Sequence, residues 1–304
     1  MPAVPVVRHV DDATVAQVAA LADHAAAVDG YRFLSDHLWL DLASGGELLA
    51  AAVPGSDHLV AYAQASPASG GWTIEATVHP EHRRADDDGL LAGVVQAVLD
   101  AVRHEGGGRV TWWTHDVSTN EISLAEKLGL TADRDLLQMR RQLPTGLPVM
   151  VETRSFRPGA DEQALLDVNN RAFAQHHEQG GWLLDTLQRR VRQAWFDPDG
   201  IRLHERDGRL AAFCWTKLHD AANGGVAVGE IYVIAVDPDF QGLGLGKQLT
   251  LAGLESIEQR GVTAAMLYVD GANTAAVGMY ERLGFSRARH DRAFGTILPP
   301  LVGD

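Results

Sequence analysis

The sequence predicts an α/β protein made of two tandem units, and three observations indicate this. The first is length, because 304 residues leave room for about two domains of ordinary size. The second is an order of strands and helices that occurs twice along the chain. The third is a break between the two occurrences, from Leu143 to Pro148, where two prolines and a glycine disfavour both helix and strand. We therefore expect domains at 1–143 and 151–304, with a linker at 144–150.

Patterns of apolar residues place the elements of the second half. They predict, in order, a strand at 151–154, helices at 161–173 and 181–196, a hairpin of strands 201–205 and 210–219 around Asp207-Gly208, a strand at 231–236, a helix at 245–259, a strand at 265–269 and a helix at 274–283.

The first half repeats this order. It predicts a helix at 12–27, strands at 48–53 and 59–65, a strand at 72–78, a helix at 90–103, a strand at 110–114 and a helix at 123–128. Val78-His79-Pro80 parallels Val236-Asp237-Pro238, and Lys127-Leu-Gly-Leu130 parallels Arg282-Leu-Gly-Phe285. The chain is therefore an internal duplication of about 150 residues per copy.

Composition bounds the class of protein. The 46% hydrophobic and 22% charged content is typical of a soluble globular chain, without an apolar run of membrane-spanning length or a signal-peptide pattern. Cys214 is the one cysteine, which excludes an intrachain disulfide and favours a reducing cytoplasm. A net charge of −14 disfavours nucleic acid as a partner. The acidity favours solubility and also suits a cationic small molecule. We expect no membrane partner. We expect a monomer.

The most informative stretch runs from Glu230 to Lys247. A buried strand ends at Asp237-Pro238, and a loop with glycines at 242, 244 and 246 leads into a helix. Bare backbone N–H groups and the positive end of the helix dipole then converge on one point, which suits a pyrophosphate. The glycine spacing fits neither the dinucleotide fingerprint, since position 249 is Leu, nor the Walker pattern, since Gln248 follows Lys247.

The pattern Gln241-x-x-Gly244-x-Gly246 after Val-Asp-Pro resembles the acyl-CoA loop of GNAT superfamily N-acetyltransferases, and the run from Asn273 to Phe285 resembles that family's second signature. The resemblance implies two GNAT-like domains, each a mixed, mostly antiparallel, splayed sheet flanked by helices, and acetyl-CoA as co-substrate. It implies these cofactor-binding residues: Ile234, Ala235, Val236, Gln241, Gly242, Leu243, Gly244, Leu245, Gly246, Lys247 and Asn273. Asn273 also suits a helix N-cap.

The two copies are unequal. After His79-Pro80 the repeated glycines are missing, and three aspartates stand where a pyrophosphate would lie. Like charge there opposes anion binding. The alignment also places Ala125 opposite Tyr280. We therefore expect a degenerate N-terminal domain and a catalytic C-terminal domain, although Arg83 and Arg84 offer the first copy some positive charge.

Three segments that are less common in the superfamily make the resemblance more specific. They are Asn169 to Phe173, His177 to Gly180 and Trp215-Thr216-Lys217, which resemble a tandem branch of the superfamily. That branch acetylates the cysteinyl amine of a cysteine–glucosamine–inositol precursor. The resemblance implies substrate contacts from Asp36, Glu178, Lys217, Glu230 and Tyr268. Transfer to another amine, such as an aminoglycoside or a peptide N-terminus, and a non-catalytic acyl-CoA sensor remain as alternatives.

Two residues are the expected catalytic groups. Glu230, at the start of the central strand, suits a base for the amine, and a solvent-facing carboxylate is its alternative role. Tyr280 resembles the family's acid for the departing sulfur, and core packing is its alternative. We expect no metal, because His176 and His177 are adjacent and diverge, and no ligand spacing completes a site. Cys214, in an apolar strand, suits the core rather than nucleophilic catalysis.

Overall fold

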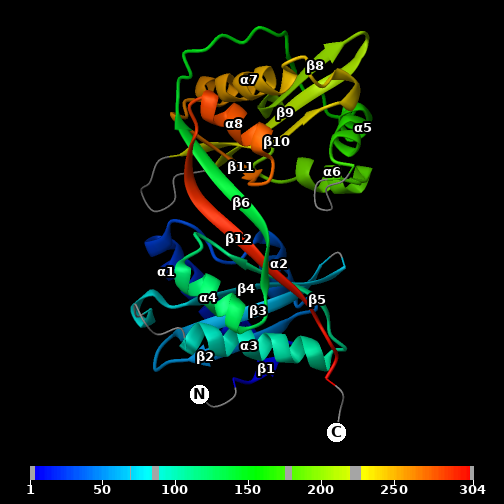
Figure 1. Cartoon of the computed structure of the whole chain (residues 1–304). Coiled ribbons are helices and arrows are strands. Elements are labelled where there is room, and N and C mark those ends of the chain that lie inside the picture. Colours follow the sequence, from blue (N-terminus) through cyan, green and yellow to red (C-terminus); the bar gives the residue numbers. More distant parts are fainter. Residues whose placement is uncertain (1–3, 69, 84–88, 175–179, 220–226, 302–304) are drawn as a thin grey trace. The chain divides into compact units, whose positions relative to one another are not determined.

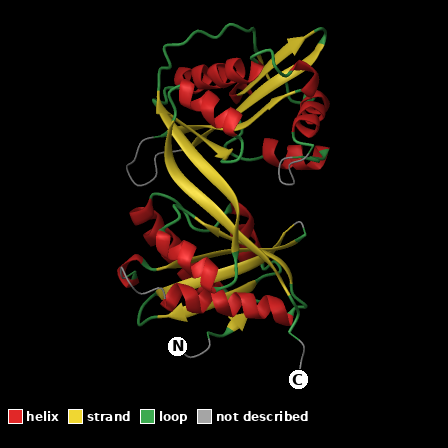
Figure 2. Cartoon of the chain, viewed as in Figure 1, coloured by secondary structure: helices red, strands yellow, loops and turns green. Residues whose placement is uncertain are grey.

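The computed structural model describes residues 4–68, 70–83, 89–174, 180–219 and 227–301. The chain forms two compact units, coloured along the sequence in Figure 1 and by secondary structure in Figure 2. Unit 1 contains residues 1–136 and 289–304, and unit 2 contains residues 137–288. Residues 144–150, the expected linker, form neither helix nor strand. Among the described residues, no helix is both long and apolar enough to cross a membrane.

Unit 1 is a mixed sheet with helices on both faces. Its elements are β1 (Val6–Val7), α1 (Asp12–Asp29), α2 (Asp36–Ser44), β2 (Leu49–Pro54), β3 (Leu59–Ala68), β4 (Gly71–Val78), the 3₁₀ helix η1 (Pro80–His82), α3 (Gly89–His104), β5 (Gly108–Thr114), α4 (Thr119–Lys127) and the end of β12 (Ser286–Leu298). The strand order is β1-β2-β3-β4-β5-β12. β4 and β5 pair in parallel, and the other pairs given for this unit are antiparallel.

Unit 2 repeats this plan. After β6 (Thr131–Gln142), which begins in unit 1, come β7 (Arg154–Ser155), α5 (Glu162–Ala172), α6 (Leu184–Val191), the 3₁₀ helix η2 (Pro198–Gly200), β8 (Ile201–Arg206), β9 (Arg209–His219), β10 (Val228–Val236), the 3₁₀ helix η4 (Pro238–Phe240), α7 (Leu245–Gln259), β11 (Ala264–Asp270) and α8 (Thr274–Arg282). The strand order is β6-β11-β10-β9-β8-β7. The fold class predicted from the sequence, α/β with mixed and mostly antiparallel sheets, is confirmed.

Two apolar layers hold the sheet of unit 2. On one face, α7 and α8 pack over β9, β10 and β11 through residues such as Leu249, Leu254 and Leu267. On the other face, α5 and α6 cover a layer that contains Trp215 and Phe213. Both layers are deeply buried, so the central strands β9 and β10 are held from two sides.

Matching hydrogen bonds confirm the duplication. The amide of His79 donates to Val60 at 2.7 Å, and the amide of Asp237 donates to Ala211 at 2.9 Å. Each residue then precedes a proline that opens a short 3₁₀ helix, η1 or η4. The turn that leads out of the central strand is therefore built in the same way in both copies.

The C-terminal strand departs from the expected domain division. Residues 289–304 belong to unit 1, whereas the sequence pattern assigned them to the second domain. The register runs antiparallel from Arg292 opposite Thr114 to Leu298 opposite Gly108. The strand thus covers the edge of β5, whose backbone N–H and C=O groups would otherwise lack partners.

Candidate functional site

The central strand of unit 2 parts from its neighbour. β10 pairs with β11 from Gly229 to Ile231, and no pairing with β11 follows in the rest of β10, all of which the structure describes. A bulge between Ile231 and Val233 shifts the register against β9 at the same place. Because a bulge bends its strand, the end of β10 turns away from β11. The splay leaves the N–H and C=O groups of Ile234 to Val236 on that edge available to an extended ligand.

Ion pairs fix the turn that follows β10. Asp237 caps η4 by accepting the amide of Asp239 at 2.9 Å. Arg171 of α5 reaches both carboxylates, at 3.2 Å and 3.0 Å, and Arg209 of β9 reaches Asp239 at 2.8 Å. Asp237 is buried, so the pair with Arg171 offsets the loss of hydration. The loop therefore starts from a position set by two neighbouring elements.

The glycine loop has the geometry expected from the sequence. Gly242 and Gly244 have φ values of +79° and +76°, which favour glycine, and a Cβ at either would meet nothing within 4 Å. Gly244 is the N-cap of α7 and has no side chain to satisfy the first amides of the helix. These amides, in the turn that contains Lys247, are therefore available to an anion in the open space beside the glycines.

A groove of about 620 Å³ joins this loop to α8. It is lined by Val236, Phe240, Gln241, Gly242, Gly244, Leu245, Gly246, Lys247, Ala275, Ala276, Met279, Arg282 and Leu283. Most of the expected loop residues are in this set. Leu243 is exposed, and Ile234 and Ala235 lie on β10 itself. The loop and α8, which carry the two sequence signatures, thus share one groove.

Arg282 lines the groove although it was not expected there. It brings a second positive charge, besides Lys247, to the same groove. Its sequence signal was weak but present, because Arg282 lies seven residues after Ala275 and so falls on the same helical face. Two cations beside a loop of free amides suit a multiply charged anion.

Tyr280 lies in the core below the groove. It is 5% exposed and packs edge-on against Phe285, with ring centroids 5.7 Å apart. Burial raises the pKa of its phenol, with a smaller contribution from Cys214, so the hydroxyl keeps its proton over a wide pH range. Asn273 is the N-cap of α8 and accepts the amide of Ala276 at 3.1 Å.

Glu230 has a partner that the sequence did not indicate. Its Oε2 atom lies 2.6 Å from Nε2 of His219, across the β9–β10 ladder. The side chain of Glu230 is 11% exposed and that of His219 is 34% exposed. Glu230 is therefore a largely buried carboxylate in contact with a more exposed imidazole.

The other expected substrate residues have different surroundings. Lys217 faces Glu230 in register, and its Nζ lies 4.7 Å from the Trp195 ring centre. Tyr268 on β11 is 36% exposed, and its hydroxyl accepts a hydrogen bond from Gln138 at 2.8 Å. Both lie on strands next to β10.

The remaining residues singled out in the sequence lie in unit 1, in the core or outside the described residues. Asp36 is an exposed residue in the first turn of α2, in unit 1. Glu178 lies outside the described residues, as do His176 and His177. Cys214 is fully buried, and burial raises the pKa of its thiol to about 12, so it is an inert core residue.

Comparison with solved structures agrees with the fold. A GCN5-related N-acetyltransferase from Sphaerobacter thermophilus superposes with a TM-score of 0.72 at 20% identity, covering 100% of this chain and 98% of that one. A tandem GNAT protein from the clavulanic acid biosynthesis pathway has a TM-score of 0.68 at 15% identity, covering 96% and 97%. At these identities the likeness concerns the fold alone.

Comparison of sequences is more specific. Residues 164–285 match the model of the acetyltransferase (GNAT) family. Mycothiol acetyltransferases are similar over most of the chain: that of Thermobispora bispora is 45% identical, covering 89% of this chain and 92% of its own, and that of Geodermatophilus obscurus is 42% identical, covering 94% and 96%. That of Kocuria rhizophila is 43% identical, covering 89% and 92%. The chain therefore belongs to the mycothiol acetyltransferase family, within the GNAT superfamily.

Proposed function

We propose that the protein transfers an acetyl group from acetyl-CoA to the cysteinyl amine of a cysteine–glucosamine–inositol precursor, which forms mycothiol. One observation carries this proposal. The glycine loop, the uncapped start of α7 and α8 enclose a groove, and the adjoining end of β10 has a free backbone edge. Glu230 lies on that same strand, so β10 would hold both the thioester and the base.

The described residues fit acetyl-CoA. The amides of the loop from Gln241 to Lys247 would hold the pyrophosphate, and Lys247 and Arg282 would balance its charge. The free edge of β10 from Ile234 to Val236 would pair with the pantetheine arm as an added strand. One of these amides would also polarise the thioester carbonyl. Asn273 would contact the arm beside its role as an N-cap.

Glu230 acts as the base in this proposal. An α-amino group has a pKa near ~8, so much of it is protonated at neutral pH and must lose a proton before it attacks. Glu230 accepts that proton, directly or through a water. His219, in contact with Glu230 and more exposed, positions the carboxylate and passes the proton to solvent.

Tyr280 acts as the acid. As the new amide bond forms and the carbon–sulfur bond breaks, the sulfur leaves as a thiolate and takes the phenol proton. Burial keeps Tyr280 protonated until that moment. Tyr280 is then restored by a proton from solvent, so the enzyme is unchanged after each turnover.

We assign recognition of the acceptor to polar side chains on the central strands of unit 2. Lys217, Tyr268 and Glu230 lie on three adjacent strands of unit 2 and offer polar groups to a polyhydroxylated sugar. We assign further contacts to Asp36 and to Glu178, which lies outside the described residues. We also propose that the first copy is a degenerate domain, and that the protein is a cytoplasmic monomer that uses no metal in catalysis.

A turnover assay tests the activity. The purified chain is given acetyl-CoA and one of three amines: the cysteinyl-glucosaminyl-inositol, an aminoglycoside or a peptide with a free N-terminus. We expect release of CoA with the first amine and at least about tenfold lower kcat/KM with the others. A preference for another amine would replace the substrate assignment. Binding of acetyl-CoA without turnover on any amine would favour the sensor alternative instead.

A further inference from the structure

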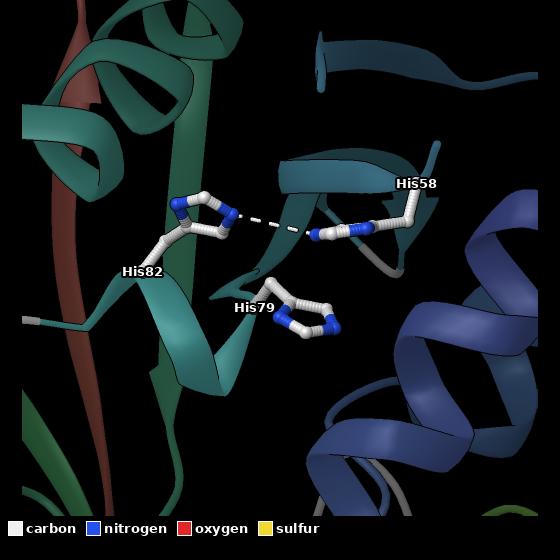
Figure 3. A group of neighbouring side chains, drawn as sticks. All are labelled: His58, His79 and His82. Atoms are coloured by element: carbon white, nitrogen blue, oxygen red, sulfur yellow. Dashed lines mark hydrogen bonds between the residues drawn. The ribbon is translucent and has the colours of Figure 1, made fainter. Parts of the chain in front are cut away.

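Three histidines from two segments of unit 1 meet at one place (Figure 3). His58 lies in the turn before β3, His79 follows β4, and His82 ends η1. Each offers a ring nitrogen, and the three nitrogens lie within 4.8 Å of one another. His79 is buried and the other two are half-buried. Since His58 is 21 residues before His79 in the sequence, the chain alone did not indicate the group.

The spacing of the nitrogens suits a transition metal. Nε2 of His58 lies 3.4 Å from Nε2 of His82. Two imidazole nitrogens that bind one zinc ion tetrahedrally, at about 2.0–2.1 Å each, are about 3.3 Å apart. These two rings therefore already have the separation of ligands to a shared ion.

His79 needs a small adjustment to complete the set. Its Nδ1 accepts the amide of Glu81 at 3.4 Å, which is a long and weak hydrogen bond. A turn of the ring would release this contact at little cost and bring a nitrogen toward the other two. The ring is in contact with that of His58, with centroids 4.3 Å apart.

The same place in unit 2 holds a cation. The equivalent hydrogen bonds from His79 to Val60 and from Asp237 to Ala211 align the two copies at this turn. Counting from these bonds, the three histidines correspond, in chain order, to Arg209, Asp237 and Phe240.

The guanidinium of Arg209 lies 4.6 Å from the centre of the Phe240 ring and pairs with Asp239 at 2.8 Å. In unit 1 the position of Asp239 is occupied by another acid, Glu81, while the arginine is replaced by His58. The acid is thus kept although an imidazole replaces the guanidinium. A metal ion among the imidazoles would restore the positive charge beside that acid.

We propose that His58, His79 and His82 bind one divalent transition metal ion of the zinc class, with water as a fourth ligand. Neutral imidazoles are good ligands for such ions. The bound ion would tie the turn before β3 to η1, as Arg209 ties the corresponding segments of unit 2. Because it would bind the folded chain only, it would raise the stability of unit 1. This site is separate from the proposed catalytic groups, which all lie in unit 2.

Metal binding to the full-length chain, freed of any histidine tag, tests the proposal. Zn²⁺ would be titrated by calorimetry, and Co²⁺ would be followed by its visible absorption, which is strong only for tetrahedral ions. We expect one ion per chain, a tetrahedral cobalt spectrum and a higher melting temperature with Zn²⁺.

The test uses variants of His58 and His82, because His79 is buried and its replacement risks misfolding. His58→Gln and His82→Gln replace half-buried rings, and each should weaken Zn²⁺ binding at least about tenfold, a loss of about 1.4 kcal/mol. His104→Gln, at the exposed end of α3, is the matched control and should bind as the parent does. Equal affinity in the parent and in the double variant His58→Gln/His82→Gln, or a cobalt spectrum without tetrahedral character, would overturn the proposal.

Discussion

Ala125 and Tyr280 occupy the same position in the two copies of the repeat. The carbonyl of Ala125 accepts the amide of Leu130 at 2.9 Å, and the carbonyl of Tyr280 accepts the amide of Phe285 at 3.0 Å. Both residues are buried near the end of their helix, α4 or α8. One copy therefore presents a methyl group where the other presents a phenol, so only unit 2 has a hydroxyl at this position.

Tyr280→Phe should separate chemistry from structure. The change removes only a hydroxyl, so the packing against Phe285 and the affinity for CoA should be kept. Turnover should fall by up to about 10² to 10⁴, the range of a general acid. Steady-state kinetics and calorimetry with CoA measure the two effects. Tyr31→Phe, a tyrosine of unit 1 that donates to the carbonyl of His115, should turn over normally. A Tyr280→Phe enzyme with parental kcat would make Tyr280 a packing residue.

Glu230→Gln should lower activity most at low pH. A smaller fraction of the amine is neutral there, so the reaction depends more on a base. His219→Gln should change the same pH profile less, because the carboxylate remains and only its partner is altered. We would measure kcat/KM from about pH 6 to about pH 9. His204→Gln, on β8, serves as the control. If neither Glu230→Gln nor His219→Gln alters the profile, the base lies elsewhere.

Local patterns accounted for the part of the fold that surrounds the groove. The strand before Asp237, the glycines at 242 and 244 and the helix from Leu245 are all encoded by neighbouring residues. Turn chemistry of this kind depends on backbone conformations that few residues adopt, so it can be read from one sequence. The two motifs also predicted that the loop and α8 act together, and residues of both line one groove.

The features that the sequence did not predict depend on contacts between residues far apart in the chain. β6 and β12 carry many charged residues, so neither has a clear apolar alternation. Asp291 of β12, for example, is buried because Arg289 and His115 neutralise it. The contact of Glu230 with His219 depends on the register of two strands, which neither strand specifies alone. The same is true of the three histidines of unit 1, which only the turn geometry brings together.

Gly244→Asp should weaken binding of acetyl-CoA at least about tenfold, or about 1.4 kcal/mol, because a carboxylate would face the phosphates. Gly261→Asp is a matched control. Its φ of +80° is close to the +76° of Gly244, and each has open space for a Cβ. Since the two glycines flank opposite ends of α7, about 22 Å of helix separates them. Calorimetry with acetyl-CoA should show a loss for Gly244→Asp alone. Asp87→Ala, at a position outside the described residues, should leave the affinity for acetyl-CoA unchanged. An equal loss of affinity in Gly244→Asp and Asp87→Ala would show that the acetyl-CoA site is assigned to the wrong copy.

A buried cluster in unit 1 should make the stability of the fold depend on pH. Nδ1 of His115 lies 3.2 Å from Oδ2 of Asp291, and their side chains are 18% and 3% exposed. Burial by itself would lower the pKa of His115, but Asp291 and the buried Glu75 outweigh it and raise that pKa above the ordinary value near 6.5. Burial would likewise raise the pKa of Asp291, yet His115 and Arg289 hold it below its ordinary range.

The sign of the His115 contribution follows from this shift. A folded-state pKa above the unfolded one stabilises the fold fully below about pH 6.5, and the contribution is lost as the pH rises through the folded value. The stability difference between the parent and His115→Gln should therefore shrink from about pH 6 to about pH 9. Urea denaturation at several pH values measures this difference, in which the other titrating groups largely cancel. His104→Gln, an exposed control, should differ little from the parent at every pH. A difference for His115→Gln that stays constant or grows with pH would show that Asp291 does not hold a charged imidazole.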